Sequence, residues 1–405
     1  MKNKKYLAWI FTAKSLNKAF AVNFFLINKL CENFEKIYFI NMNKFKLFKD
    51  WSTYKGEFIY ELDSKFKIPK NIEIFCPNTI NDFEDFIIDK EIIAINQIGR
   101  FLTDLKIHFL LKKYKIKQVQ ISAGGFFNSS LTPKNRFWKN LIYKINKNFS
   151  HKLVVLLSNL KLVPKIQIRF TSSAKIVEII NNSFVKKILY NLKLLYAKEF
   201  VVINSNSFDI LKNIKMEVSE KKIVLLDADL NHPETIAVTG NPDKKKVEKH
   251  YYHLNKLINN LSIMYKKEIV ICIHPYDNLE LKKKYFPNLK VVKYESRENI
   301  YKAFLVFFFD TSAIVDALLL KKRILCIISN FAPVITANTG QHYVDEAGVL
   351  KINIEEEIKI SKDKFLSKLD DAKNNYTNYI NSYIVPDGNN LGYEKIIKIL
   401  KERFF

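Results

Sequence analysis

The sequence predicts an α/β protein with two domains, each built on a parallel sheet that has helices on its faces. The chain has 405 residues, enough for two domains of ordinary size with separate cores. Along both halves, short apolar runs of strand length alternate with longer segments of helical periodicity, as in repeated strand–helix–strand units. Only 9 glycines and 10 prolines occur, so no low-complexity segment interrupts this alternation.

The first half begins with an apolar strand at 6–12, and a helical pattern follows it. Lys14 lies two residues after this strand and is a candidate substrate contact. Gly124 and Gly125 follow another expected strand, and such a turn lets the backbone approach a ligand closely; a plain tight turn is the alternative. The remaining strands of this half are expected at 36–41, 72–76, 92–96, 118–122, 153–157, 166–171 and 200–204.

The second half repeats the alternation. Its first strand, at 222–227, precedes a helix with an apolar stripe at helical spacing, formed by Val247, Tyr251, Leu254, Leu257, Ile258, Leu261 and Met264. Further strands are expected at 269–273, 289–292, 305–309 and 323–328. We therefore expect one domain at 1–205, joined by a C-terminal helix at 392–405, and a second domain at 206–391.

The bulk composition limits the partners and the compartment. The formal net charge of +25 suits an anionic partner, although a lysine-rich composition alone supplies such a charge. No zinc finger or dense basic helix is present, which disfavours nucleic acid; the basic, aromatic segment 135–152 is the candidate for contact with an anionic membrane surface. The widely spaced cysteines, and the lack of a signal peptide or a long apolar run, predict a reduced, cytoplasmic protein, peripheral to the membrane at most.

Two apolar runs of the second half end abruptly in polar residues. The first is followed by His274 and Pro275, and the second, at 305–309, leads to Thr311 and Ser312. Ligands of an open parallel sheet bind outside the carboxyl ends of its strands, so we expect both groups at one edge. We also expect Thr311 and Ser312 to open a helix, where hydroxyls and backbone N–H groups favour an anion. The pair predicts a phosphate site, although each motif alone is equally an ordinary turn.

Acidic residues follow the strand at 222–227 and are the candidates for proton transfer or nucleophilic attack. Asp227, Asp229 and Glu234 supply carboxylates, and His232 is a candidate partner. The first residue past a strand is held most rigidly, which favours Asp227 over Asp229. An acidic turn that caps the next helix is the structural alternative, and Asp310, which would repel a phosphate, is likewise expected to be a cap.

Two doubly wound halves facing a central cleft resemble the GT-B architecture of many glycosyltransferases. His274-Pro275 resembles the HP motif of bacterial CMP-sugar transferases of the sialic acid and Kdo types, and Thr311-Ser312 resembles their Ser/Thr motif, which holds the donor phosphate. The resemblance covers residues 222–330. It implies transfer of an acidic sugar from a CMP-activated donor to a glycan or lipid-linked acceptor, as in polysaccharide, capsule or lipopolysaccharide synthesis, without a metal or other cofactor.

Other interpretations of the same residues stay open. A UDP-sugar or CDP-glycerol transferase also places His and Ser/Thr near donor phosphates, and a sugar-nucleotide epimerase shares the two-domain form. A non-catalytic, basic, membrane-associated protein is the alternative outside enzymes. Gln341 and His342, in an expected loop that begins at Asn330, are candidate contacts for the donor.

Overall fold

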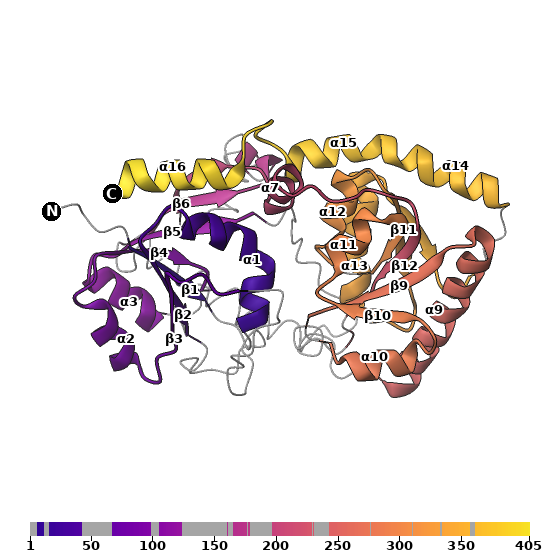
Figure 1. Cartoon of the computed structure of the whole chain (residues 1–405), viewed down its shortest axis with the longest axis horizontal. Helices are drawn as coiled ribbons and strands as arrows, with labels where there is room; N and C mark the ends of the chain where they lie inside the picture. The colour runs from indigo at the N-terminus through magenta and orange to yellow at the C-terminus, as the bar shows by residue number, and fades with distance from the viewer. Residues whose placement is uncertain are drawn as a thin grey trace. The chain divides into compact units, whose positions relative to one another are not determined.

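The chain forms two units, each with its own sheet and core (Figure 1). Described residues up to Asp209, together with those from Val385 onward, belong to unit 1, and Ile210–Ile384 forms unit 2. The expected boundary at 205/206 lies four residues before the observed one. The computed structural model describes residues 6–11, 16–42, 67–98, 105–123, 160, 165–175, 177–178, 197–228, 230, 243–275, 277–309, 311–332, 334–356 and 361–405.

Unit 1 contains a seven-stranded sheet in the order β3-β2-β1-β4-β5-β6-β7, and all neighbouring strands run parallel. The first strands pair in the order 3-2-1-4-5-6, which is that of the dinucleotide-binding Rossmann fold. The strands are β1 (Tyr6–Phe11), β2 (Lys36–Asn41), β3 (Ile72–Phe75), β4 (Ile92–Asn96), β5 (Lys117–Ser122), β6 (Ile166–Thr171) and β7 (Ala197–Val202).

Unit 2 contains a six-stranded parallel sheet in the order β10-β9-β8-β11-β12-β13. Counted from its own first strand, this is again the order 3-2-1-4-5-6, so the order reverses between β8 and β11. The strands are β8 (Lys222–Leu226), β9 (Glu268–Ile273), β10 (Lys290–Lys293), β11 (Ala303–Phe308), β12 (Arg323–Ile328) and β13 (Leu350–Asn353). The predicted class, α/β with two Rossmann-like domains of the GT-B type, is confirmed in these two sheets.

Helices follow most strands and cover the sheets. Those described are α1 (Leu16–Cys31), α2 (Ile80–Ile87), α3 (Leu105–Lys113), α7 (Asn206–Asn213), α9 (Lys244–Tyr265), α10 (Leu279–Tyr285), α11 (Ser296–Tyr301), α12 (Ile314–Leu319), α13 (Val334–Ala347), α14 (Lys362–Ala372), the 3-10 turn Lys373–Asn375, α15 (Tyr376–Tyr379), the π-helical turn Ile380–Ile384 and α16 (Gly392–Phe404).

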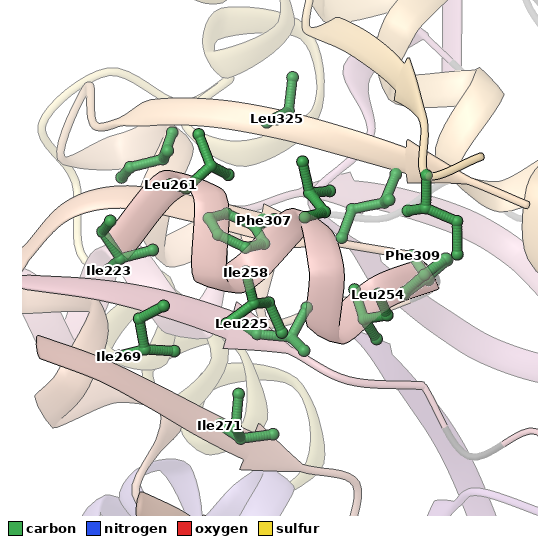
Figure 2. Close-up of a cluster of buried hydrophobic side chains, with 14 of the residues drawn as sticks. Ile223, Leu225, Leu254, Ile258, Leu261, Ile269, Ile271, Phe307, Phe309 and Leu325 are labelled. Atoms are coloured by element: carbon green, nitrogen blue, oxygen red, sulfur yellow. The ribbon is translucent and has the colours of Figure 1, made fainter. Parts of the chain in front are cut away.

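The core of unit 2 forms between α9 and one face of its sheet (Figure 2). Alternate strand residues point to the same face, so Ile223 and Leu225 of β8 both reach the helix. Leu254 and Ile258 of α9, one turn apart, pack against them and are fully buried. The predicted stripe on this helix is thus a core face, and it fixes α9 along the sheet.

The C-terminal helix α16 packs into the core of unit 1, as expected (Figure 1). Asp209 accepts hydrogen bonds from the backbone N–H groups of Gly392 (2.8 Å) and Tyr393 (2.9 Å), which satisfies the start of the helix. A Cβ on Gly392 would lie 2.5 Å from the carbonyl oxygen of Asn204, so this close approach requires glycine. The Asn204 side chain in turn donates to the carbonyl oxygens of Gly388 and Asn390, at 2.7 Å each.

Some expected elements differ from the structure. The segment expected as a loop from Asn330 contains helix α13, and strand β13 was not expected at all. The helix expected to open at Thr311 and Ser312 begins only at Ile314. The strand expected at 153–157 lies outside the described residues.

Candidate functional site

The candidate site of unit 2 lies at the carboxyl edge of β9, β8 and β11. Leu226 of β8 pairs with Cys272 of β9 on one side and with Phe308 of β11 on the other, so the three strands end level. His274 follows β9, and Thr311 follows β11. The sheet therefore places the two predicted groups at one edge, on either side of the end of β8. This edge includes the β8–β11 switch point, where sheets of this order bind ligands.

His274 begins a tight turn. Its carbonyl oxygen accepts a hydrogen bond from the Asp277 N–H at 2.9 Å, and Pro275 occupies the second position, where its fixed φ is favourable. Both His274 and Pro275 are half-buried. Lys293, at the end of β10, donates to the carbonyl oxygen of Asp277 at 3.0 Å. The turn is thus tied to the neighbouring strand end.

Thr311 and Ser312 form a turn before the short helix α12. The Oγ1 atom of half-buried Thr311 accepts a hydrogen bond from the Ala313 N–H at 3.2 Å, which orients this hydroxyl toward its own backbone. Ser312 is exposed. Its carbonyl oxygen accepts from the Val315 N–H at 3.2 Å. Of the two side chains, Ser312 is therefore the more accessible to a ligand.

Asp227 lies in a buried ionic cluster with Lys282 of α10. The Lys282 Nζ is 2.5 Å from Asp227 Oδ2 and 3.2 Å from Asp277 Oδ2, and the exposed fractions of the three side chains are 3%, 1% and 5%. The ammonium also donates to the Ala228 carbonyl oxygen at 3.2 Å and to the Tyr251 hydroxyl. The Tyr251 hydroxyl lies 3.4 Å from Asp227 Oδ2, to which it donates.

The charges of this cluster support one another. Burial alone would lower the pKa of Lys282, but the carboxylates of Asp227 and Asp277 raise it well above its usual value, so the side chain stays an ammonium ion. Burial, together with the Asp227 charge, raises the pKa of Tyr251 well above its usual value, so this phenol stays neutral. The Asp227 carboxylate is 1% exposed and bound to the ammonium, out of reach of a substrate, which argues for a structural role of Asp227.

His250, one residue before Tyr251 on α9, is fully buried beside the same cluster. Neither ring nitrogen has a hydrogen-bond partner, and the ring lies 4.9 Å from that of Phe309, the residue directly after β11. Burial, reinforced by the Lys282 charge, lowers the pKa of this imidazole to about 3. The side chain is therefore neutral at physiological pH.

Two of the other predicted contacts, Gln341 and His342, lie among the described residues and have partners within unit 2. Gln341 and His342 lie on α13, where the Gln341 amide donates to Asp345 at 2.6 Å. His342 is buried among aromatic rings, with its Nε2 3.5 Å from the Tyr379 hydroxyl. Their role as donor contacts stays a prediction. Lys14, Gly124, Gly125, Asp229, His232, Glu234, Asp310 and the membrane segment 135–152 lie outside the described residues.

Sequence reasoning did not find Lys282, which stands first in a run of three lysines typical of a solvated helix face. A signal was nevertheless present. Leu279, Lys282 and Phe286 follow the spacing of one helix face, and both Lys282 and Phe286 are buried. In the part of the chain that the structure describes, no helix is long and apolar enough to cross a membrane, and no group of three His, Cys, Asp or Glu side chains is arranged to hold a metal ion.

Comparison with known proteins gives a fold but no family. No protein-family model matches the sequence, and no curated protein does. Solved structures do match. One from Listeria monocytogenes, assigned as a UDP-N-acetylglucosamine 2-epimerase, has a TM-score of 0.51 at 13% identity over 99% of this chain and 96% of that one.

Two further structures match at a similar level. The calicheamicin glycosyltransferase CalG4 has a TM-score of 0.52 at 9% identity, over 99% of this chain and 98% of that one. A variant of the wall teichoic acid polymerase TagF has a TM-score of 0.52 at 10% identity, over 100% of this chain and 90% of that one. At these identities the likeness shows the GT-B-like fold alone.

Proposed function

We propose that this chain is a glycosyltransferase that takes its sugar from a nucleotide-activated donor, and that unit 2 binds the donor. The observation that supports this most is the level ending of β9, β8 and β11, with His274 on one side of β8 and Ser312 on the other. Proteins of the same fold include the glycosyltransferase CalG4.

The chemistry of this edge suits a donor phosphate. An imidazole N–H and a serine hydroxyl both donate hydrogen bonds to phosphate oxygens, and such bonds to a charged group are stronger than neutral ones. The carboxylates of Asp227 and Asp277 are buried, and both are paired with the Lys282 ammonium, which offsets part of their charge. Donor binding by His274, Pro275, Thr311 and Ser312 is therefore our assignment for this site.

Proton removal from the acceptor needs a carboxylate or imidazole that the acceptor reaches. The burial and ion pair of Asp227 argue against it in this role. The sequence favoured Asp227 over Asp229 as the catalytic carboxylate, and we now favour Asp229. We assign the role to Asp229, with His232 and Glu234 three and five residues further along the sequence as candidate partners. Substitution of Asp229 by Asn should lower turnover by about 100-fold or more, the usual scale for loss of a general base, with nucleotide affinity unchanged.

For the donor itself we propose a CMP-activated acidic sugar, on the strength of the His-Pro and Thr-Ser pair and their order in the chain. CDP-glycerol is the second candidate, because a TagF variant soaked with CDPG has a TM-score of 0.51 to this chain at 12% identity. A UDP-sugar is the third. The three differ in base and in phosphate number, so free nucleotides separate them.

Calorimetric titration of the full chain with CMP, CDP, UDP, UMP and GDP tests the proposal. His274→Ala and Ser312→Ala should each weaken binding of the preferred nucleotide by about 1.5–3 kcal/mol, the scale of a lost hydrogen bond to a charged group. Ser329→Ala is the matched control. Ser329 also follows a strand of this sheet, but its hydroxyl is already bonded to Glu355 at 2.8 Å, so the variant should bind normally. Unchanged affinity in both site variants would refute the donor site.

A further inference from the structure

The buried cluster around Lys282 joins three parts of unit 2 that bear on the candidate site. Asp227 and Ala228 follow β8, Asp277 closes the turn that begins at His274, and Tyr251 belongs to α9. One side chain thus links the end of β8 to the turn after β9. Lys282 lies 55 residues from Asp227 in the sequence, so this link is purely tertiary.

The geometry of the ammonium shows which role it can take. A lysine ammonium has three N–H donors. In this structure they have acceptors at Asp227 Oδ2, the Ala228 carbonyl oxygen and the Tyr251 hydroxyl, and Asp277 adds a second carboxylate at 3.2 Å. With an exposed fraction of 3%, the side chain has neither a spare donor nor a path to a ligand. It therefore does not bind the donor phosphate itself.

We propose that Lys282 is a positioning residue, which holds the turn of His274 and Asp277 against the end of β8 and so fixes where His274 stands at the edge of the sheet. An effect of Lys282 on donor binding rests on the proposed function, whereas its contact between the turn and the end of β8 does not. A buried ion pair adds little net stability because desolvation offsets its attraction, so its effect falls chiefly on local geometry. The hydrogen bond within the turn and the contact from Lys293 tie the turn to itself and to β10, whereas Lys282 ties it to the end of β8.

The test compares Lys282→Met with Arg323→Met. Arg323 is the matched control. It is the first residue of β12, so it lies at the amino ends of the strands, away from His274, and it is paired with Asp370 at 2.8 Å. Lys282→Met leaves two buried carboxylates without their cation, so a second variant, Lys282→Met with Asp227→Asn and Asp277→Asn, removes all three charges together and protects folding.

The readout is the imidazole signal of His274 in the full chain, labelled at its 7 histidines and identified by its absence in His274→Ala. We expect this signal to shift or broaden in both Lys282 variants and to stay in place in Arg323→Met, although all variants lose stability. An unchanged His274 signal in a folded Lys282 variant would overturn the proposal.

Nucleotide titration of the same proteins separates the link from the proposed function. If the wild-type chain binds a nucleotide, its affinity should fall by about tenfold in the Lys282 variants, as for a displaced phosphate contact, and stay unchanged in Arg323→Met. Equal affinities would overturn the role of Lys282 in donor binding. If the wild-type chain binds none of the nucleotides, the proposed function fails, and the link to the turn is judged by the His274 signal alone.

Discussion

Asp227, the first residue after β8, and Lys282 of α10 form an ion pair from which water is excluded. The distance from Nζ to Oδ2 is 2.5 Å, and the side chains are 1% and 3% exposed. Asp277 lies 3.2 Å from the same ammonium, so loss of Lys282 would leave two uncompensated carboxylates, whereas loss of the Asp227 charge would leave Lys282 paired with Asp277. We therefore assign Asp227 and Lys282 a structural role in unit 2 rather than a role in the chemistry.

Asp227→Asn should therefore act on stability. We expect the free energy of unfolding, measured in urea, to fall by about 1.5–3 kcal/mol, the scale of a lost hydrogen bond between charged groups, while Asp277 still pairs with the ammonium. Glu217→Gln is the control, since its pair with Lys221 is exposed on both sides and its loss should leave stability nearly unchanged. A variant with normal stability and about 100-fold lower turnover would instead restore Asp227 as the catalytic carboxylate.

His250 should make unit 2 sensitive to acid. Its pKa of about 3 in the folded chain lies below the usual 6.5 of the unfolded chain. As the pH falls from about 6.5 toward 3, the unfolded state gains a proton that the folded state does not, so stability falls by up to about 1.4 kcal/mol per pH unit. His250→Leu loses no hydrogen bond, because the ring makes none, and it should flatten this slope. Parallel pH profiles of the two proteins would contradict the prediction.

Gly340 of α13 should be essential for the close packing of that helix on the strand ends. A Cβ at this position would lie 2.6 Å from the Cys326 sulfur and 2.9 Å from the carbonyl oxygen of Phe309. Gly340→Ala should lower the unfolding free energy by about 1–3 kcal/mol, as for other overpacked cores. Adding Cys326→Ala should recover only part of the loss, because the backbone oxygen cannot be removed. Full recovery would show that the sulfur alone sets the limit.

The strands of both sheets could be predicted from the sequence because their signal is local. Runs such as Ile223–Leu226 and Ile269–Ile273 are uninterrupted apolar segments of strand length, which parallel sheets covered on both faces require. The edge with His274 and Ser312 followed from those strands, since polar residues directly after parallel strands meet at one edge.

What could not be predicted depends on tertiary contacts or on weak local signals. Helix α13 contains Thr336, Thr339 and Gly340, residues of low helix propensity, so its sequence resembles a loop. The pairing of Lys282 with Asp227 joins residues far apart in the chain, and no local pattern reports it. The charge of a residue therefore does not predict its burial here, because Lys282 is buried although it stands in a run of lysines.

Asp209 should give unit 1 the opposite pH dependence to that of His250. Burial raises the pKa of this carboxyl to about 6, although its hydrogen bonds from Gly392 and Tyr393 lower it in part. Between the unfolded value of about 4 and this folded value, the folded chain keeps a proton that the unfolded chain has lost, so stability falls as the pH rises through the interval.

Asp209→Asn cannot titrate and can still accept a hydrogen bond at the start of α16. The unfolding free energy of the wild type, relative to that of Asp209→Asn, should therefore decrease from pH 4 to pH 6 and level off above it, as measured by urea unfolding at each pH. A difference that stays constant across this range would show that the carboxyl is already ionised at pH 4, and that the helix start holds it as an anion.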